Sequence, residues 1–273
     1  MDQQVGDLGV ASIEEINALP ADQAEALYLR LIPEPVLSRL AVDPHTLCDG
    51  EGRRLVRVTA PSGQPWARVE LRASADDRDA AYLIDVEMST LAVPELAFVQ
   101  LTDPGSPRYA IDLSTDGDDT LFGTVGRNVD EEVRAMRAGL APGQVRRGLR
   151  LLGSVLDAMS DFARLLGHEI FLIEPLFYHS AVLYERRGCG YVLGRDRMEA
   201  IDAGFRAGGE LHRRLDGSTH FRRVGAEGSV RGRSWALHDG LWTESWGGRW
   251  SGIKMYKAAG RQAGVSTASV TLY

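Results

Sequence analysis

The chain has 273 residues, of which 44% are hydrophobic and 25% charged, ordinary proportions for a globular protein with enough surface to bury a core. Its formal net charge of −7 argues against a surface coated with basic residues for nucleic acid. The charge is unevenly divided, because from Arg186 onward 15 basic residues stand against 8 acidic ones, a local charge of +7 that leaves −14 on the first 185 residues.

The first residues, MDQQVGDLGVASIEE, carry no basic region, and no window of about 18 apolar residues occurs anywhere. We therefore expect a cytoplasmic protein with no membrane span. Cys48 and Cys189 lie far apart and belong to no C-x-x-C pair, so we expect two free thiols rather than a disulfide or a zinc site.

The N-terminal part of the chain predicts helices. Ser12 and Glu15 have the spacing of a capping box, and Pro20 suits the first turn of a second helical run. The prolines of the P-E-P triplet at 33–35 break that run. We expect an N-terminal helical segment over residues 1–45.

After this segment the pattern changes to an alternation of apolar and polar residues. Residues 53–60 and 66–73, joined by a P-S-G-Q-P turn, predict a β-hairpin with one solvent-exposed face. Further strands are expected at 81–88, 95–102 and 108–113. This half of the chain therefore predicts a mostly antiparallel sheet.

An acidic, glycine-rich stretch at 114–128 predicts a loop, and 130–140 predicts a short helix with an acidic first turn. From Val145 to Leu166, apolar residues recur with alternating spacings of four and three, which predicts one long helix with an apolar face. Gly167 suits the position that ends such a helix.

The following residues predict a β-α-β order. An apolar run at 169–174 indicates a buried, parallel-type strand, 178–187 a helix and 190–194 another strand, so we expect these strands to be neighbours or near-neighbours in one sheet. Residues 197–215 predict a helix with glycine interruptions, whereas the tryptophan-rich stretch 229–264 predicts loops and short strands.

The start of the expected long helix is rich in glycine and arginine. Free amide groups at a helix start bind anions, and Gly143 and Gly148 allow a close approach of the backbone. Arg146, Arg147 and Arg150 add side chains that bind phosphate in a bidentate way. A solvated, arginine-rich first turn is the alternative, although cations at a helix N-terminus are unfavourable without an anion nearby.

Residues 181–191 read A-V-L-Y-E-R-R-G-C-G-Y. Together with the glycine and arginine loop, the long helix and the strand at 169–174, they resemble the second half of the GNAT superfamily of acyl-CoA N-acyltransferases. In that superfamily a loop at a helix start holds the pyrophosphate of coenzyme A, and a tyrosine of the later motif often protonates the leaving thiolate. The resemblance implies the first role for Gly143, Arg146, Arg147, Gly148 and Arg150, and the role of general acid for Tyr184.

An N-acyltransferase also needs a base, or a chain of water molecules, to deprotonate its amine substrate. Asp85 and Glu87 lie two residues apart on one expected strand and so share a face, and Asp112 lies on another. We take Glu87 as the candidate base. The alternative, that all three are ordinary surface carboxylates, stays open.

Three further residues are candidates for substrate binding. His179 precedes Tyr184 by five residues, close to the expected thioester end of the cofactor. Trp242 and Trp246 belong to the aromatic C-terminal stretch, which either shapes an acceptor pocket or packs onto the acidic part of the chain. The histidines lack the i, i+4 spacing of a helical metal site, and we expect no metal.

We therefore expect an α+β fold with a GNAT-like mixed central sheet flanked by helices. The helical segment would precede a core at 46–195, and a basic extension at 196–273 would pack on that core. The expected activity is direct transfer of an acetyl or other acyl group from acyl-CoA to a small-molecule or peptide amine. Two alternatives stay open, a catalytically inactive GNAT-like binding or regulatory module and a nucleic-acid or polyanion binder acting through the extension. A homodimer also stays open.

Overall fold

The computed structural model describes residues 9–120, 125–242 and 250–273. It forms two compact units. The first unit contains Met1–Pro104, Gly148–Glu174 and Tyr256–Gln262, and the second contains Gly105–Arg147, Pro175–Met255 and Ala263–Tyr273. The chain passes between the units several times, so each is built from segments that are distant in the sequence.

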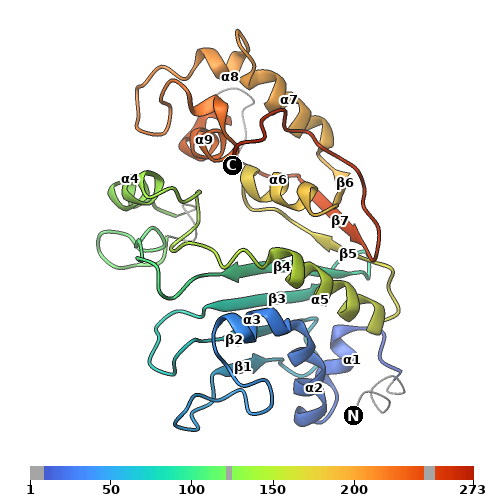
Figure 1. The fold of residues 1–273 in the computed structure, drawn as a ribbon. Coiled ribbons are helices and arrows are strands. Elements are labelled where there is room, and N and C mark those ends of the chain that lie inside the picture. Colours follow the sequence, from blue (N-terminus) through green and yellow to red (C-terminus); the bar gives the residue numbers. More distant parts are fainter. Residues whose placement is uncertain (1–8, 121–124, 243–249) are drawn as a thin grey trace. The chain divides into compact units, whose positions relative to one another are not determined.

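The fold is α+β with a mixed sheet in the order β1-β2-β3-β4-β5-β7-β6 (Figure 1). Its strands are β1 (Val56–Thr59), β2 (Trp66–Leu71), β3 (Tyr82–Met88), β4 (Pro94–Leu101), β5 (Ile170–Ile173), β6 (Gly190–Leu193) and β7 (Lys254–Ala258). Neighbours from β1 to β4 are antiparallel, whereas β4 and β5 are parallel. The structure confirms the predicted hairpin as β1 and β2, and the next two predicted strands as β3 and β4. It also confirms the buried strand after the long helix as β5, and the strand predicted at 190–194 as β6.

In the first unit, α1 (Ile13–Asn17), α2 (Ala21–Tyr28), η1 (Leu29–Leu31), α3 (Glu34–Arg39) and α5 (Leu152–Leu165) accompany the sheet (Figure 1). The Tyr82 hydroxyl on β3 donates to the carbonyl of Leu31, which shows the face of the sheet that meets these helices. The side chains of that face on β2 and β3 are fully buried: Ala67, Val69, Leu71, Tyr82, Ile84 and Val86. On the other face, Arg68 binds Asp85 through two hydrogen bonds of 2.7 Å. The alternation in the sequence thus separates an apolar from a polar face.

Polar contacts fasten the N-terminal helices to the hairpin. The Ser12 hydroxyl caps α1 by accepting from the Glu15 amide at 3.2 Å, as the capping box predicts, while the Glu15 carboxylate accepts from the Ala11 amide at 2.6 Å. At the other end of α1, the buried Asn17 amide donates to the carbonyl of Trp66 at 3.0 Å and accepts from the Tyr28 hydroxyl at 2.5 Å.

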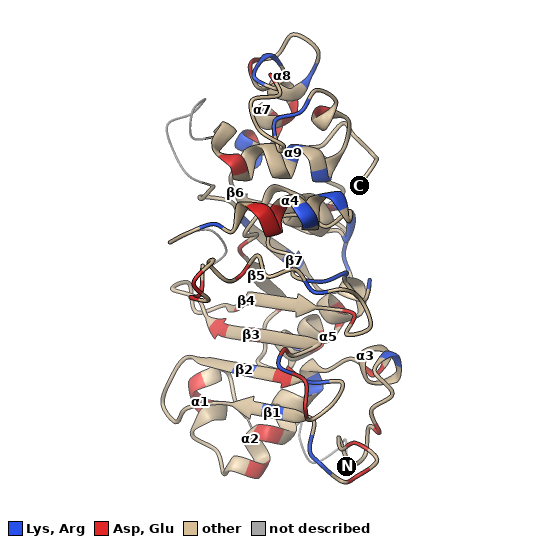
Figure 2. Ribbon diagram, turned by 90° about the vertical axis from the view of Figure 1, so that its left-hand side faces the viewer, with Lys and Arg blue, Asp and Glu red and all other residues tan. Residues whose placement is uncertain are grey.

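The second unit contains α4 (Val129–Arg137), α6 (Tyr178–Arg186), α7 (Arg195–Phe205), α8 (Glu210–Arg213), η3 (Ala226–Gly228), α9 (Val230–Ala236) and η4 (Leu237–Leu241). Helix α4 has acidic residues in its first turn and basic ones in its last, which suits the helix dipole (Figure 2). Trp235, 1% exposed, stacks on Phe221 and donates from its indole nitrogen to the carbonyl of Leu140 at 2.8 Å.

The C-terminal residues belong to the packing of this unit. The Thr267 hydroxyl donates to the Glu185 carboxylate at 2.6 Å, and the Ser269 hydroxyl donates to the Asp202 carboxylate at 2.6 Å. The Val230 amide donates to the carbonyl of Leu272 at 2.9 Å. These bonds hold the end of the chain against α6, α7 and α9.

The strand predicted at 108–113 is wrong, since this segment forms a loop with one isolated bridge, between Leu113 and Asp119. The Asn128 side-chain amide donates to the carbonyl of Leu113 at 3.0 Å, and the Tyr109 amide donates to the carbonyl of Val145 at 2.8 Å. The backbone groups that a strand would pair are therefore bonded to other loops.

The start predicted for the long helix is also wrong, because α5 begins at Leu152 rather than near Val145. The backbone of Arg150 has φ +63°, in the left-handed region that an α-helix excludes. Val145 and Leu149 are buried as the apolar pattern requires, but from a loop. The C-terminal part of the prediction is confirmed, since α5 ends at Leu165 and Gly167 has φ +80°.

Throughout the described ranges, the helices are too short or too polar to cross a membrane.

Candidate functional site

The parallel pair β4–β5 is joined over only two residue pairs, Glu95–Leu172 and Leu96–Ile173. Strand β5 ends there, whereas β4 continues to Leu101. The register between β3 and β4 shifts at the same place and leaves Ala97 as an extra residue, a β-bulge. Bulges bend a strand, interrupt its pairing and are frequent beside active sites. From Ala97 to Leu101, β4 is therefore not paired with β5.

The loop that precedes α5 is bonded to the end of β4. The Leu149 amide donates to the carbonyl of Leu101, the last residue of β4, at 3.3 Å. A Cβ atom on Gly148 would lie 3.2 Å from the same carbonyl oxygen, so the close approach favours glycine. Arg150 is exposed, and no side chain caps the N-terminus of α5 at Leu151. A 14-residue helix with uncapped first amides and an arginine beside it is suited to an anion.

The other three residues of the predicted cofactor set lie in the second unit. Gly143 has φ +78°, and a Cβ atom there would lie 2.5 Å from the ring of Phe177. The Arg146 guanidinium donates to the carbonyl of Ser106, and the Arg147 amide donates to the Ser106 hydroxyl at 3.2 Å. Gly143 and Arg146 therefore have structural partners within their unit, while the side chain of Arg147 is exposed.

Tyr184, the candidate acid, lies on α6 and is 7% exposed. Burial raises the pKa of its hydroxyl above the ordinary value, and the nearby Cys189 thiol adds to this. The phenol is protonated at neutral pH at its ordinary pKa as well, so the raised pKa makes it a weaker proton donor without changing its charge.

His179 occupies a closed environment on the same helix. Its Nδ1 lies 2.9 Å from the Ser234 hydroxyl, and its ring stacks on Phe177, whose ring also meets Gly143. Burial, with the charges of Arg231 and His238, lowers the pKa of His179 to about 3. The residue predicted to bind substrate is thus a buried, neutral histidine with a hydroxyl partner.

The carboxylates considered as bases differ in their surroundings. Asp85 is paired with Arg68, and Asp112 is paired with Arg108 at 2.7 Å. Glu87 is exposed on β3, directly opposite Glu95 of β4, which is only 4% exposed. Glu95 is not a candidate from the sequence, because it stands at the start of an apolar run and there indicates only the beginning of a strand. A charged residue that leads directly into L-A-F-V was the available signal.

Trp242 is buried and its ring meets that of Trp250 at 6.1 Å. Trp250 in turn contacts Tyr178 and donates to the carbonyl of Pro175 at 2.8 Å. Trp246 lies outside the described residues.

The two cysteines are free, as predicted. A search of the described part of the chain finds no group of three His, Cys, Asp or Glu side chains that could hold a metal ion. Comparisons of the chain with protein-family models, with curated proteins and with solved structures find no match.

Proposed function

We propose that the protein binds acyl-CoA and transfers the acyl group to an amine, with the pyrophosphate of the cofactor at the loop 148–151 and the first amides of α5. The observation that carries this proposal is the occurrence of three features along β4, of which the last lies at its carboxyl end. These are the bulge at Ala97, the β4–β5 ladder of two residue pairs, and the uncapped start of α5 next to Leu101. Ligands of parallel sheets bind outside the carboxyl ends of the strands.

The same features suit the other end of the cofactor. The pantetheine arm is an extended chain with two amide groups, and extended chains bind along strand edges through backbone hydrogen bonds. The part of β4 from Ala97 to Leu101 continues beyond its ladder with β5 and would receive the arm.

In the proposed reaction the amine attacks the thioester carbonyl, a base takes the proton of the amine, and the carbon–sulfur bond breaks. The leaving thiolate takes up a proton, which yields the amide and free coenzyme A, and the GNAT-like motif at 181–191 gives the role of proton donor to Tyr184. The base is one of the two carboxylates that face each other on β3 and β4, Glu87 or Glu95. Because Glu95 is buried at the end of the β4–β5 ladder, we favour it over the exposed Glu87.

The activity is tested by incubating the protein with acetyl-CoA and a panel of amines and detecting acetylated products by mass spectrometry. For an amine that is acetylated, Tyr184→Phe should lower kcat by about 10²-fold or more while the affinity for acetyl-CoA changes less than about threefold. Binding of acetyl-CoA without any product across the panel would favour a binding or regulatory module. Equal losses of kcat and of affinity would contradict the acid role of Tyr184.

A further inference from the structure

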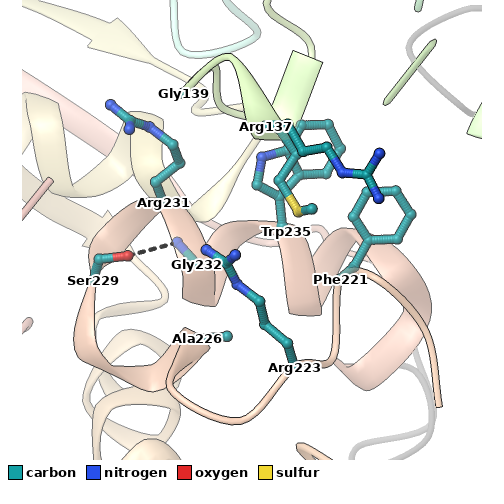
Figure 3. Close-up of a pocket in the computed structure, with 10 residues that line it drawn as sticks. Arg137, Gly139, Phe221, Arg223, Ala226, Ser229, Arg231, Gly232 and Trp235 are labelled. Atoms are coloured by element: carbon teal, nitrogen blue, oxygen red, sulfur yellow. Dashed lines mark hydrogen bonds between the residues drawn. The ribbon is translucent and has the colours of Figure 1, made fainter. Parts of the chain in front are cut away.

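The second unit contains a cavity of about 250 Å³ between the end of α4, the loop before α9 and α9 itself (Figure 3). Three arginines line it, and Figure 3 shows that they come from three segments: Arg137 ends α4, Arg223 lies on the loop and Arg231 lies on α9. None of the three was a candidate in the sequence, where they are spread over almost a hundred residues.

Nearby carboxylates are paired with other basic residues. Glu132 binds Arg127 and lies 3.0 Å from His238, and Asp239 binds Arg127 at 3.0 Å and Arg222 at 2.9 Å. Among the residues that the structure describes, Arg137, Arg223 and Arg231 have no ion pair. Three like charges around one small cavity repel each other, and a bound anion would relieve this repulsion.

Arg231 supplies a second observation. Its Nε atom is buried and has no hydrogen-bond partner within the described residues. Its guanidinium carbon lies 5.0 Å from the centre of the Tyr273 ring, a cation–π contact that fixes the side chain without satisfying that N–H. Buried donors are usually paired in proteins, so this N–H is available to an acceptor on a bound molecule.

The remaining wall of the cavity is apolar. Phe221 and Trp235 stack with their ring centres 5.0 Å apart, and Met136 packs against them. The cavity is smaller than the usual range for drug-sized ligands, so it suits a compact molecule. Guanidinium groups bind the oxygens of phosphate in a bidentate way, and the apolar wall would contact a small carbon group.

We propose that this cavity binds the phosphate or pyrophosphate group of a small molecule, as a site separate from the loop 148–151. Arg137 and Arg223, both exposed, would close on the phosphate oxygens, and Arg231 would hold it from α9. The phosphate belongs either to a free phosphoester or to coenzyme A itself.

The test titrates pyrophosphate, phenyl phosphate and coenzyme A separately into the full chain by calorimetry. The variant Arg137→Gln/Arg223→Gln removes two charges from the cavity. The matched control, Arg195→Gln/Arg213→Gln, removes two exposed charges from the same unit, and neither control residue lines the cavity. Because all four side chains are exposed, we expect both variants to fold, and circular dichroism checks this.

We expect pyrophosphate affinity to fall at least about tenfold in the cavity variant and less than about twofold in the control. A parallel loss for phenyl phosphate identifies a free phosphoester as the ligand, and a loss confined to pyrophosphate and coenzyme A identifies the cofactor. Equal losses in the two variants, or a loss caused only by Arg150→Ala in the other loop, would overturn the proposal.

Discussion

The carboxylate of Asp202 accepts a hydrogen bond from the guanidinium of Arg233 over 2.7 Å, and these side chains are only 2% and 3% exposed. The same carboxylate accepts from the Ser269 amide at 2.8 Å. One buried ion pair thus joins α7, α9 and the C-terminal segment within the second unit.

Removing one member of this pair should destabilise the unit strongly. In Asp202→Ala, Arg233 keeps a buried charge without its carboxylate, and we expect the free energy of unfolding to fall by about 3–5 kcal/mol. The matched control is Arg206→Ala, which removes the exposed partner of Asp202 and should cost less than about 1 kcal/mol. Urea unfolding followed by tryptophan fluorescence measures both. Similar losses in the two variants would show that the buried pair is no more important than the exposed one.

His179 should make the protein sensitive to mild acid. Because burial lowers its pKa in the folded state to about 3, the unfolded chain binds a proton below about pH 6.5 that the folded chain does not. The stability from the neutral ring is therefore present above pH 6.5 and is lost as the pH falls toward 3, by about 1.4 kcal/mol per pH unit. Unfolding free energies measured between pH 7 and pH 4.5 should show a smaller slope in His179→Gln than in the wild type. Identical slopes would argue against a buried neutral histidine.

The sequence predicts that Gly143 binds phosphate, and in the structure Gly143 packs against the ring of Phe177. We expect Gly143→Ala to lower the free energy of unfolding by about 2–4 kcal/mol, because the new methyl group meets Phe177 and the φ of +78° is strained. Gly63→Ala is the control: its φ is +70°, no atom lies within 4 Å of the new Cβ, and we expect about 1 kcal/mol from strain alone. Equal thermal shifts for the two variants would show that the Phe177 contact adds nothing.

Conservative substitutions distinguish whether Glu95 or Glu87 is the base. If Glu95 is the base, Glu95→Gln should lower kcat/KM by about 10²-fold or more, while Glu87→Gln lowers it less than about tenfold. Steady-state kinetics with an amine that the wild type acetylates measures both. A larger loss of kcat/KM in Glu87→Gln than in Glu95→Gln would indicate that Glu87 is the base, as the sequence predicts.

Most strands and helices could be predicted because their signals are local. Alternation along 66–71 and 82–88 separates the two faces of the sheet, and the capping box at Ser12 marks the start of α1. The loop at 145–151 was misassigned because Val145 and Leu149 continue the apolar period of α5 while being buried from a loop. The left-handed backbone of Arg150 leaves no trace in hydrophobic spacing.

The arrangement of the candidate site was less predictable, because its parts depend on contacts between distant segments. The bulge at Ala97 lies inside a uniformly apolar run, so the sequence does not mark it. In the sequence Asp202 is indistinguishable from a surface residue of a helix, because its partners Arg233 and Ser269 come from distant segments. The cavity arginines likewise come together only in the folded unit.

Calorimetric titration with acetyl-CoA measures whether the start of α5 holds the pyrophosphate of acyl-CoA, as we propose. The variants to compare with the wild type are Arg150→Ala, beside the start of α5, and Arg164→Ala, an exposed arginine in the last turn of the same helix. We expect binding by the wild type, an affinity at least about tenfold lower in Arg150→Ala and an unchanged affinity in Arg164→Ala. An absence of binding at millimolar acetyl-CoA, or equal affinities in all three proteins, would contradict the proposal.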